Sequence, residues 1–236
     1  MDFATSTAYI AIGDLDGDGK SDIAAVNSST NTVSLFRNTS TWGVINSGSF
    51  AAKVDFVTGW FPMSVVIGDL DGDGKPELIS ANSYNGAGGN SVSVLRNTSS
   101  SGIINASSFA ANVEFATGKS PYSVAIGDID GDGKPDICTG NNGAYSVSVL
   151  RNTSSSGVIN AGSFAAHVDF NTGTSPFSIA ISDIDGDGKP DLAEAGYGSF
   201  SSRVSVLRNL IGTISTMTSA SSASVCSEQQ IYINNI

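Results

Sequence analysis

The sequence is poor in charged residues, cysteine, histidine and long apolar runs. Of its 236 residues, 14% are charged, two are cysteine and one is histidine. Two cysteines cannot form the dense disulfide framework of a small secreted domain, and Cys138 and Cys226 lie in segments of different character, so we expect two unpaired thiols. No segment approaches the ~20 apolar residues of a membrane-spanning helix, so we expect no membrane span. Residues 1–3 show neither the basic region nor the apolar core of a signal peptide.

Basic residues are also few, and this argues against a nucleic-acid partner. The chain has 11 Lys and Arg against 22 Asp and Glu, a formal charge of −11. It has no basic stripe, and phosphates repel an acidic surface. Sixteen of the 22 acids lie in four short segments, and four divalent cations bound there would change the charge from −11 to −3. The acidity therefore indicates metal binding and not a cationic partner.

The four acidic segments are copies of one nonapeptide, at residues 14–22, 69–77, 128–136 and 183–191. Each carries acids at places one, three, five and nine, glycines at four and six, and lysine at seven. Such a dense group of like charges is unfavourable unless a cation lies among them. A hard ion with six to eight oxygen ligands fits, and calcium fits best. Glycine allows the positive φ values with which a short loop wraps around an ion.

We therefore predict up to four Ca²⁺ ions as cofactors. The predicted side-chain ligands are Asp14, Asp16, Asp18, Asp22, Asp69, Asp71, Asp73, Glu77, Asp128, Asp130, Asp132, Asp136, Asp183, Asp185, Asp187 and Asp191. The lysines at place seven are expected to offer their main-chain carbonyl and to point the ammonium outward: Lys20, Lys75, Lys134 and Lys189.

Two other interpretations of the nonapeptide are weaker. A single copy is compatible with a solvated acidic turn, but four copies with the same glycines are not easily explained in that way. An EF-hand needs an acid at place twelve and a helix on each side. Place twelve is Ala25, Ser80, Thr139 and Glu194, so only one copy has the acid. The flanks are short and β-branched, which indicates strands.

The loops recur after 55, 59 and 55 residues, which defines a repeat. In the third copy, residues 121–127, 137–141, 146–152 and 164–170 have strand character. Four antiparallel strands in about 55 residues are one blade of a β-propeller. With 27 glycines and few charges, the chain is predicted to be all-β, a β-propeller with four blades present. The length varies only between strands two and three, most at residues 85–90, where a binding surface could differ between blades.

Both ends of the repeat array are irregular. Residues 2–5 match the end of a fourth strand, and in closed propellers such a segment often completes the last blade. The fourth copy departs from the repeat after Asn209, so blade four lacks its own outer strand. We therefore divide the chain into a propeller at 1–209 and, at 210–236, a linker with the incomplete start of a following domain.

These four nonapeptides, each preceded by a short apolar strand and followed by an alternating Ser-Val strand, resemble FG-GAP (VCBS-type) repeats, which also build the integrin α-chain propeller. The resemblance covers about residues 2–209. It implies a calcium-binding propeller, usually of about seven blades, whose loop acids take the metal-ligand places. It also implies an exported, extracellular or cell-surface module for adhesion or for binding a protein or glycan ligand, with neighbouring domains. The tail is similar, more weakly, to the start of an Ig/PKD-like module.

Copy one lacks the proline found at Pro62, Pro121 and Pro176, and only four blades are present, so this chain is expected to be part of a larger ring. Rival functions are a polysaccharide-acting enzyme and a structural spacer. We expect no enzyme, because a catalytic site needs residues unique to one blade and these copies are nearly interchangeable.

Other candidate residues have simple structural interpretations. The single histidine, His167, occupies a variable slot held by Lys53 and Asn112 in other copies, and is expected at the surface. Arginines that end strand three could bind anionic sugars, but are expected to pair within their own blade: Arg37, Arg96, Arg151 and Arg208. Asn-Thr-Ser at 38, 97 and 152 matches a glycosylation acceptor, but an Asx-type turn is favoured. Glu194 breaks a small-residue position and faces either solvent or a central channel.

Overall fold

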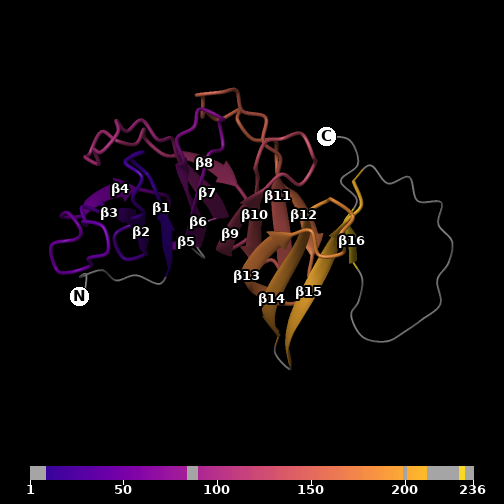
Figure 1. Ribbon diagram of the computed structural model, residues 1–236. Coiled ribbons are helices and arrows are strands. Elements are labelled where there is room, and N and C mark those ends of the chain that lie inside the picture. The colour runs from indigo at the N-terminus through magenta and orange to yellow at the C-terminus, as the bar shows by residue number, and fades with distance from the viewer. Residues whose placement is uncertain (1–8, 84–89, 199–200, 212–228, 232–236) are drawn as a thin grey trace, which may run out of the picture.

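A computed structural model of the chain describes residues 9–83, 90–198, 201–211 and 229–231. The described residues form sixteen strands and no helix, arranged as four sheets of four strands (Figure 1). The predicted all-β architecture of propeller-type blades is confirmed. None of the described parts contains a helix of the length and apolarity that crossing a bilayer requires.

Each sheet, called blade 1 to blade 4 in chain order, takes its strands consecutively from the sequence. Blade 1 comprises β1 (Ile10–Gly13), β2 (Asp22–Asn27), β3 (Thr32–Phe36) and β4 (Val54–Val57). Blade 2 comprises β5 (Pro62–Gly68), β6 (Glu77–Ser83), β7 (Asn90–Leu95) and β8 (Val113–Ala116). Blade 3 comprises β9 (Pro121–Gly127), β10 (Asp136–Asn141), β11 (Ser146–Leu150) and β12 (Val168–Asn171). Blade 4 comprises β13 (Ser175–Ser182), β14 (Asp191–Gly198), β15 (Ser201–Asn209) and β16 (Gln229–Ile231).

The outer edge of blade 4 differs from the other three. Neighbouring strands in blades 1 to 3 are antiparallel, whereas β16 pairs with β15 in parallel. The outer strand thus comes from the 210–236 segment and not from the repeat, so this segment takes part in the fourth sheet. The prediction that it also begins another domain, and the strand match at residues 2–5, concern residues outside the described part of the chain.

The hydrophobic core lies between the blades and not within them. One cluster joins Leu15, Val26 and Leu35 of blade 1 to Val65 and Leu78 of blade 2. Equivalent clusters join blades 2 and 3 and blades 3 and 4. The middle strands are therefore buried on both faces, as the full burial of β6 and β10 shows. This explains why neighbouring residues such as Leu78 and Ile79 of β6 are both apolar, in place of strict alternation.

The first strands of neighbouring blades approach closely because each of β1, β5 and β9 ends in glycine. A Cβ added to Gly68 would lie 2.1 Å from Ile126 Cδ1, and one added to Gly127 would lie 2.9 Å from Ile181 Cγ2. Gly13 stands in the same relation to Ile67, at 3.1 Å. We call this position the glycine seat, because an isoleucine of the following blade packs over it.

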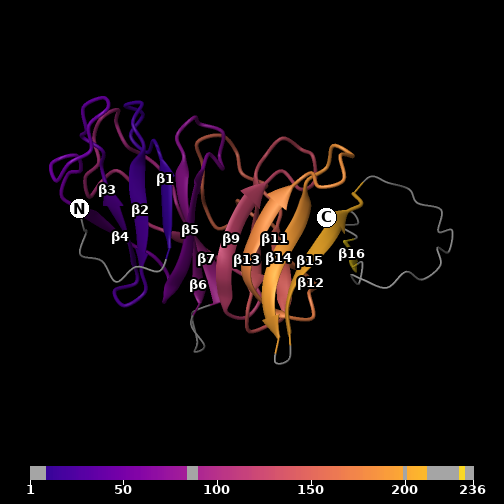
Figure 2. The same ribbon diagram turned by 60° about the horizontal axis from the view of Figure 1, so that its bottom comes forward.

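The four blades stand side by side in an open row and do not close a ring within the described residues (Figure 2). The strands β9 and β13 run in the same direction, so the loops that follow them lie at one end of the row. Cys138 is buried in β10 as a free thiol, as expected, and Cys226 lies outside the described residues.

Candidate metal centre

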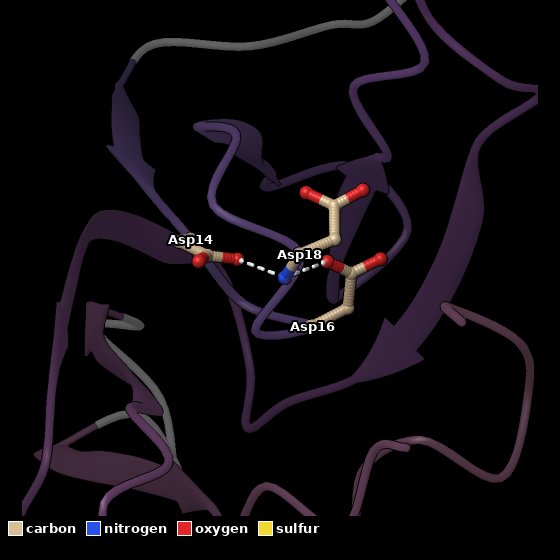
Figure 3. Close-up of side chains that lie close together, drawn as sticks. All are labelled: Asp14, Asp16 and Asp18. Atoms are coloured by element: carbon tan, nitrogen blue, oxygen red, sulfur yellow. Dashed lines mark hydrogen bonds between the residues drawn. The ribbon is translucent and has the colours of Figure 1, made fainter. Parts of the chain in front are cut away.

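The four acidic loops join the first and second strands of each blade, and their glycines shape them as predicted. Gly17 and Gly19 have φ values of 66° and 83°, and the corresponding glycines of the other loops are also positive. The backbone consequently turns back on the first acid. In blade 1, the amide nitrogen of Asp18 donates to the carboxylate of Asp14 at 3.2 Å (Figure 3). The amide nitrogen of Gly19 donates to the same carboxylate at 2.8 Å.

Each loop brings three carboxylates together, with one oxygen from each lying within 4.8 Å of the others. The acids at places one and three belong to the group in all four loops. The third member is the fifth-place acid in loops 1 and 4 and the ninth-place acid in loops 2 and 3. The groups are Asp14, Asp16 and Asp18; Asp69, Asp71 and Glu77; Asp128, Asp130 and Asp136; and Asp183, Asp185 and Asp187. Of the predicted ligands, Asp22, Asp73, Asp132 and Asp191 stand outside these groups.

The ninth-place acid also anchors its loop to the blade. Asp22, which is fully buried, accepts the amide hydrogens of Leu15 at 3.0 Å and of Asn38 at 2.8 Å. The equivalent residues Glu77, Asp136 and Asp191 are buried and accept the corresponding amides. Each carboxylate oxygen keeps a further lone pair, so this anchoring is compatible with binding a cation.

Burial makes the charge on the ninth-place acids costly. Desolvation raises the pKa of Asp22 to about 6, that of Glu77 to about 7 and that of Asp136 to about 6. The neighbouring loop acids raise these pKa values further, while the backbone hydrogen bonds oppose the shift. A divalent cation in the loop would favour the ionised form of these acids.

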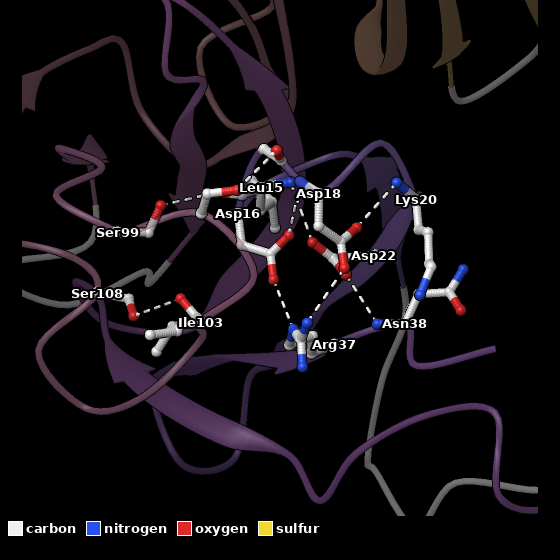
Figure 4. A network of polar contacts seen from close by, with 12 residues as sticks. Leu15, Asp16, Asp18, Lys20, Asp22, Arg37, Asn38, Ser99, Ile103 and Ser108 are labelled. Carbon is white, nitrogen blue, oxygen red and sulfur yellow. Dashed lines mark hydrogen bonds and ion pairs between the residues drawn. The ribbon is translucent and has the colours of Figure 1, made fainter. Parts of the chain in front are cut away.

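The arginines that end the third strands pair within their own blades, as predicted, and the structure identifies their partners as loop acids. Arg37 donates from Nε to Asp16 at 2.6 Å and from Nη2 to Asp18 at 3.1 Å (Figure 4). Arg96 and Arg208 make the same two contacts in blades 2 and 4, and Arg151 lies 3.8 Å from Asp130. The positive charge of one arginine neutralises the negative charge of only one of the four acids in a loop.

The donor set therefore fits a hard divalent cation. It consists of carboxylate oxygens, three of which converge, and a net negative charge remains after the arginine is counted. Oxygen-only sites of this kind favour calcium over the transition metals, which prefer imidazole and thiolate. Binding through the carbonyl of the seventh-place lysine stays a prediction. The ammonium groups of these lysines were expected to point outward, but two of them do not. Lys75 donates to the carbonyl of Ser99 and Lys134 to that of Ser154, each at 2.8 Å.

The structure also connects the first two acidic loops to the following blade, and sequence reasoning missed this connection. We call residues 38–43, 97–102 and 152–157 the latch segments of blades 1, 2 and 3. In blade 2, Asn97 Nδ2 and Ser99 Oγ donate to the carbonyl of Leu15, at 2.8 and 3.1 Å (Figure 4). The Gly102 amide donates to the carbonyl of Asp16 at 3.0 Å. Blade 3 repeats these contacts on loop 2, so loops 1 and 2 are each held by the latch of the next blade.

The Asn-Thr-Ser sequences form Asx-type turns, the interpretation that the sequence analysis favoured over glycosylation. The Ser99 amide donates to Asn97 Oδ1 at 2.9 Å, and the turns at Asn38 and Asn152 are the same. Asn97 and Asn152 are buried and use their amide nitrogen at the blade interface. This is incompatible with glycosylation of these two side chains in the folded protein.

Two further candidates have structural roles. His167 contacts Asp169 at 3.0 Å, as Lys53 contacts Asp55 at the same repeat position. Its side chain is 28% exposed, which agrees with the expected surface position. Glu194 is 1% exposed, so it does not face solvent. Thr174 donates to its Oε1 at 3.0 Å. Its Oε2 would lie 2.7 Å from a Cβ added to Gly196, so this carboxylate fills the space where blades 2 and 3 carry Asn82 and Asn141.

Comparisons with known proteins agree with this architecture. A crystal structure of the V. cholerae biofilm matrix protein Bap1 is similar at 17% identity and a TM-score of 0.50, over 85% of this chain and 26% of that protein. A structure titled as BBS1N in complex with ARL6DN, soaked with mercury, is similar at 13% identity and a TM-score of 0.53, over 89% of this chain and 52% of that protein. The chain thus spans about a quarter and about half of these proteins, and at such identities the likeness concerns the fold alone.

No curated protein matches the sequence. The sequence profile of the FG-GAP-like repeat matches twice, at residues 14–80 and 69–139, which together cover more than half of the chain. Both matches begin at the first acid of an acidic loop and continue into the second strand of the next blade. The chain therefore belongs to the family of FG-GAP-like repeat proteins.

Proposed function

We propose that this chain is a calcium-stabilised, extracellular propeller-type module that binds a protein or glycan ligand. The observation that carries the calcium part is the convergence of three carboxylates in each of four loops. Burial of the ninth-place acids supports it, because a folded protein at neutral pH needs a counter-charge for them. An extracellular location suits the chemistry, since calcium sites in extracellular modules typically have dissociation constants of 10⁻⁴ to 10⁻³ M, near the calcium level outside cells.

Calcium titration tests this proposal directly. We expect isothermal titration of the chelator-treated chain to show about four sites, with Kd values of roughly 10⁻⁴ to 10⁻³ M. The double substitution Asp128→Asn and Asp130→Asn removes two carboxylates of one group and should remove one site. Asp169→Asn, which changes an acid of the outer strand β12, is the matched control and should leave all sites. Absence of calcium binding at millimolar concentration would contradict the proposal.

Ligand binding is proposed for the end of the row opposite the acidic loops. Exposed aromatic side chains gather on the segments there: Trp60, Phe61, Tyr145, Phe177 and Tyr197, each between 42% and 61% exposed. They precede or begin β5, β11 and β13 or lie near the end of β14. Aromatic residues are enriched where proteins bind partners, and flat rings also pack on sugar rings. The end of β6 and the start of β7, between which the length of the repeat varies most, also lie at this end.

A binding screen with two tryptophan variants tests the ligand part. Calcium-loaded protein is applied to a glycan array and to a panel of extracellular-matrix proteins, and any ligand found is titrated. Trp60→Ala should weaken its binding at least tenfold, whereas Trp42→Ala, at the acidic-loop end, should not. Equal losses for the two variants would place the ligand elsewhere, and an absence of any ligand would favour a structural spacer. We propose binding without catalysis, because His167 has a structural contact and the four loops are near copies.

A further inference from the structure

Blade 4 lacks a side-chain network that blades 2 and 3 share. In blade 3, Thr139 Oγ1 donates to Asn141 Oδ1 at 2.9 Å, and Asn141 Nδ2 donates to Ser148 Oγ at 2.7 Å. Blade 2 has the same network. In blade 4, Glu194 and Gly196 occupy the places of the threonine and the asparagine, so the amide that joins this network is absent.

This replacement leaves a buried carboxylate oxygen without a partner. Glu194 is 1% exposed, and its Oε1 accepts a hydrogen bond from Thr174 Oγ1 at 3.0 Å. Its Oε2 makes no hydrogen bond within the described residues. Thr174 is itself 1% exposed, whereas Trp60 and Lys119, which hold this place in blades 2 and 3, are exposed. The chain that enters blade 4 therefore turns a side chain inward, toward the carboxylate.

A second unpartnered group faces the same junction from blade 3, whose strand β9 lies beside β13 (Figure 2). Ser123 is 6% exposed, and its Oγ makes no hydrogen bond within the described residues. A Cβ added to Gly140 would lie 2.7 Å from this Oγ and 3.0 Å from Ile179 Cγ2 of blade 4. Ile179 is the ladder partner of Glu194, and directly opposed residues of antiparallel strands share a face. Both unpartnered atoms therefore lie beside Ile179, between blades 3 and 4.

Aromatic rings border this junction at the end of the row opposite the acidic loops. Phe177 lies two residues before Ile179 in β13 and is 42% exposed. Tyr197 lies three residues after Glu194 in β14 and is 61% exposed. The ring of Phe177 meets the ring of Tyr122 of blade 3 edge to face, with the ring centroids 5.3 Å apart. This pair spans the two blades, nearer the end of the row than the buried polar groups.

A further exposed ring near this junction is held in a strained backbone conformation. Tyr145 has a φ of 56° and is 54% exposed. Its counterparts Asn31 and Asn90 use their side chains within the fold, since each accepts an amide hydrogen of the chain that enters the next blade. The left-handed region is unfavourable for a large side chain. Strained residues of this kind cluster at functional sites.

We propose that the junction of blades 3 and 4, at the end of the row opposite the acidic loops, binds one sugar unit of a glycan. The inference rests on the proposed function and names its ligand as a glycan. One sugar hydroxyl donates to Glu194 Oε2, another pairs with Ser123 Oγ, and the apolar face of the sugar ring packs on an exposed aromatic ring. A sugar offers adjacent donors and acceptors together, whereas a lysine or arginine of a protein ligand would offer donors alone.

Both polar atoms are covered, so binding requires movement at the end of the junction. The edge-to-face pair of Tyr122 and Phe177 spans the two blades there, and Phe177 is partly exposed. Separation of these rings would open a path to Glu194 and Ser123. Near-ultraviolet circular dichroism should therefore change when the sugar binds, because this signal reports the packing of aromatic side chains.

Simple probes test the site with the full, calcium-loaded chain: the methyl glycosides of mannose, galactose, glucose and N-acetylglucosamine. Saturation-transfer NMR identifies those that bind, and titration measures their affinity. We expect at least one to bind with a Kd of roughly 1 mM. The double substitution Glu194→Thr and Gly196→Asn, which restores the residues of blade 3, should weaken this binding by roughly tenfold or more. Because the restored network satisfies its polar groups, the melting midpoint should be unchanged or higher.

Tyr145→Asn is the second variant, since asparagine occupies this place in blades 1 and 2. Asparagine tolerates a positive φ, so the melting midpoint should not fall, whereas sugar binding should weaken by roughly threefold or more. Trp60→Ala is the matched control. It removes an exposed ring at the junction of blades 1 and 2 and should leave the binding of a single sugar unit unchanged.

Sugar binding that survives both variants would overturn the inference. A loss in Trp60→Ala as large as in the two variants would place the sugar outside this junction, which overturns the inference and leaves the proposed function intact. If the natural chain binds none of the probes and no glycan of the array, the inference fails. A matrix-protein ligand would then still support the proposed function, and the absence of any ligand would refute both.

Discussion

Removal of calcium is expected to lower the melting midpoint of this protein by roughly 12–24 °C. At a tenfold excess of calcium over Kd, each site stabilises the fold by about 1.4 kcal/mol. Four independent sites give about 6 kcal/mol, comparable with the whole stability of a typical domain. For a protein of this size, 1 kcal/mol corresponds to roughly 2–4 °C. Calorimetric scans at pH 7.5 in calcium and in EDTA measure the difference.

The same scans at pH 5 should show a smaller difference. Without calcium, the pKa values of Asp22, Glu77 and Asp136 in the folded protein are raised to about 6 or 7, above the ordinary values near 4 of the unfolded state. Groups with raised pKa values stabilise the fold fully below about pH 4 and lose that contribution as the pH rises through 6 to 7. The metal-free protein should thus melt higher at pH 5 than at pH 7.5.

The calcium-loaded protein should respond in the opposite direction, because protons compete with calcium for the same carboxylates. The melting midpoints of the calcium-loaded and the metal-free protein should therefore approach each other as the pH falls. Magnesium is the control: it prefers strict octahedral geometry and retains its water, so it should restore little of the midpoint. An EDTA scan that coincides with the calcium scan at pH 7.5 would refute the structural role of calcium.

The repeated elements of this fold could be predicted from sequence because each depends on local chemistry. Glycines at places four and six predicted the positive φ values of Gly17 and Gly19. The short, β-branched flanks of the acidic loops predicted strands, and β5 and β6 adjoin the second loop as expected. A charged residue at one fixed place of every repeat predicted that Arg37 pairs within its own blade, although not that its partners are Asp16 and Asp18.

The features that could not be predicted depend on residues far apart or on departures from the repeat. Asn97 donates a hydrogen bond to the carbonyl of Leu15, which lies 82 residues earlier in the sequence. Nothing in the sequence around either residue indicates this contact. Besides being a predicted ligand, Asp22 accepts hydrogen bonds from two main-chain amides. This second role depends on how β3 passes the loop. In blade 4, the carboxylate of Glu194 occupies the space that the absent side chain of Gly196 leaves, so Glu194 considered alone appeared to break the pattern. The strand β16 pairs through main-chain groups, which side-chain patterns do not record.

The contact between latch and loop predicts a large difference between two identical substitutions. Asn152 is fully buried and donates to Leu70 of loop 2 and to Pro135, each at 2.8 Å, while its Oδ1 accepts the Ser154 amide. Asn152→Ala leaves the Pro135 carbonyl and the Ser154 amide without these partners, each at a cost of about 1–3 kcal/mol. The Leu70 carbonyl loses one of its two donors and keeps Ser154 Oγ. We expect a loss of about 3–4 kcal/mol, or a midpoint lowered by roughly 6–16 °C.

Asn38→Ala is the matched control, because Asn38 has the same turn and the same bond within its blade but, among the described residues, no hydrogen bond to another blade. It should cost only about 1–2 kcal/mol. Asn152→Asp separates the contributions further, since it retains the acceptor of the Asx turn but removes the two donated hydrogen bonds. If the latch also orders loop 2, Asn152→Asp should weaken one calcium site in a titration, whereas Asn38→Asp should weaken none. Equal losses from Asn152→Ala and Asn38→Ala would mean that the bond across the blades contributes nothing, and that the acidic loops fold independently of their neighbours.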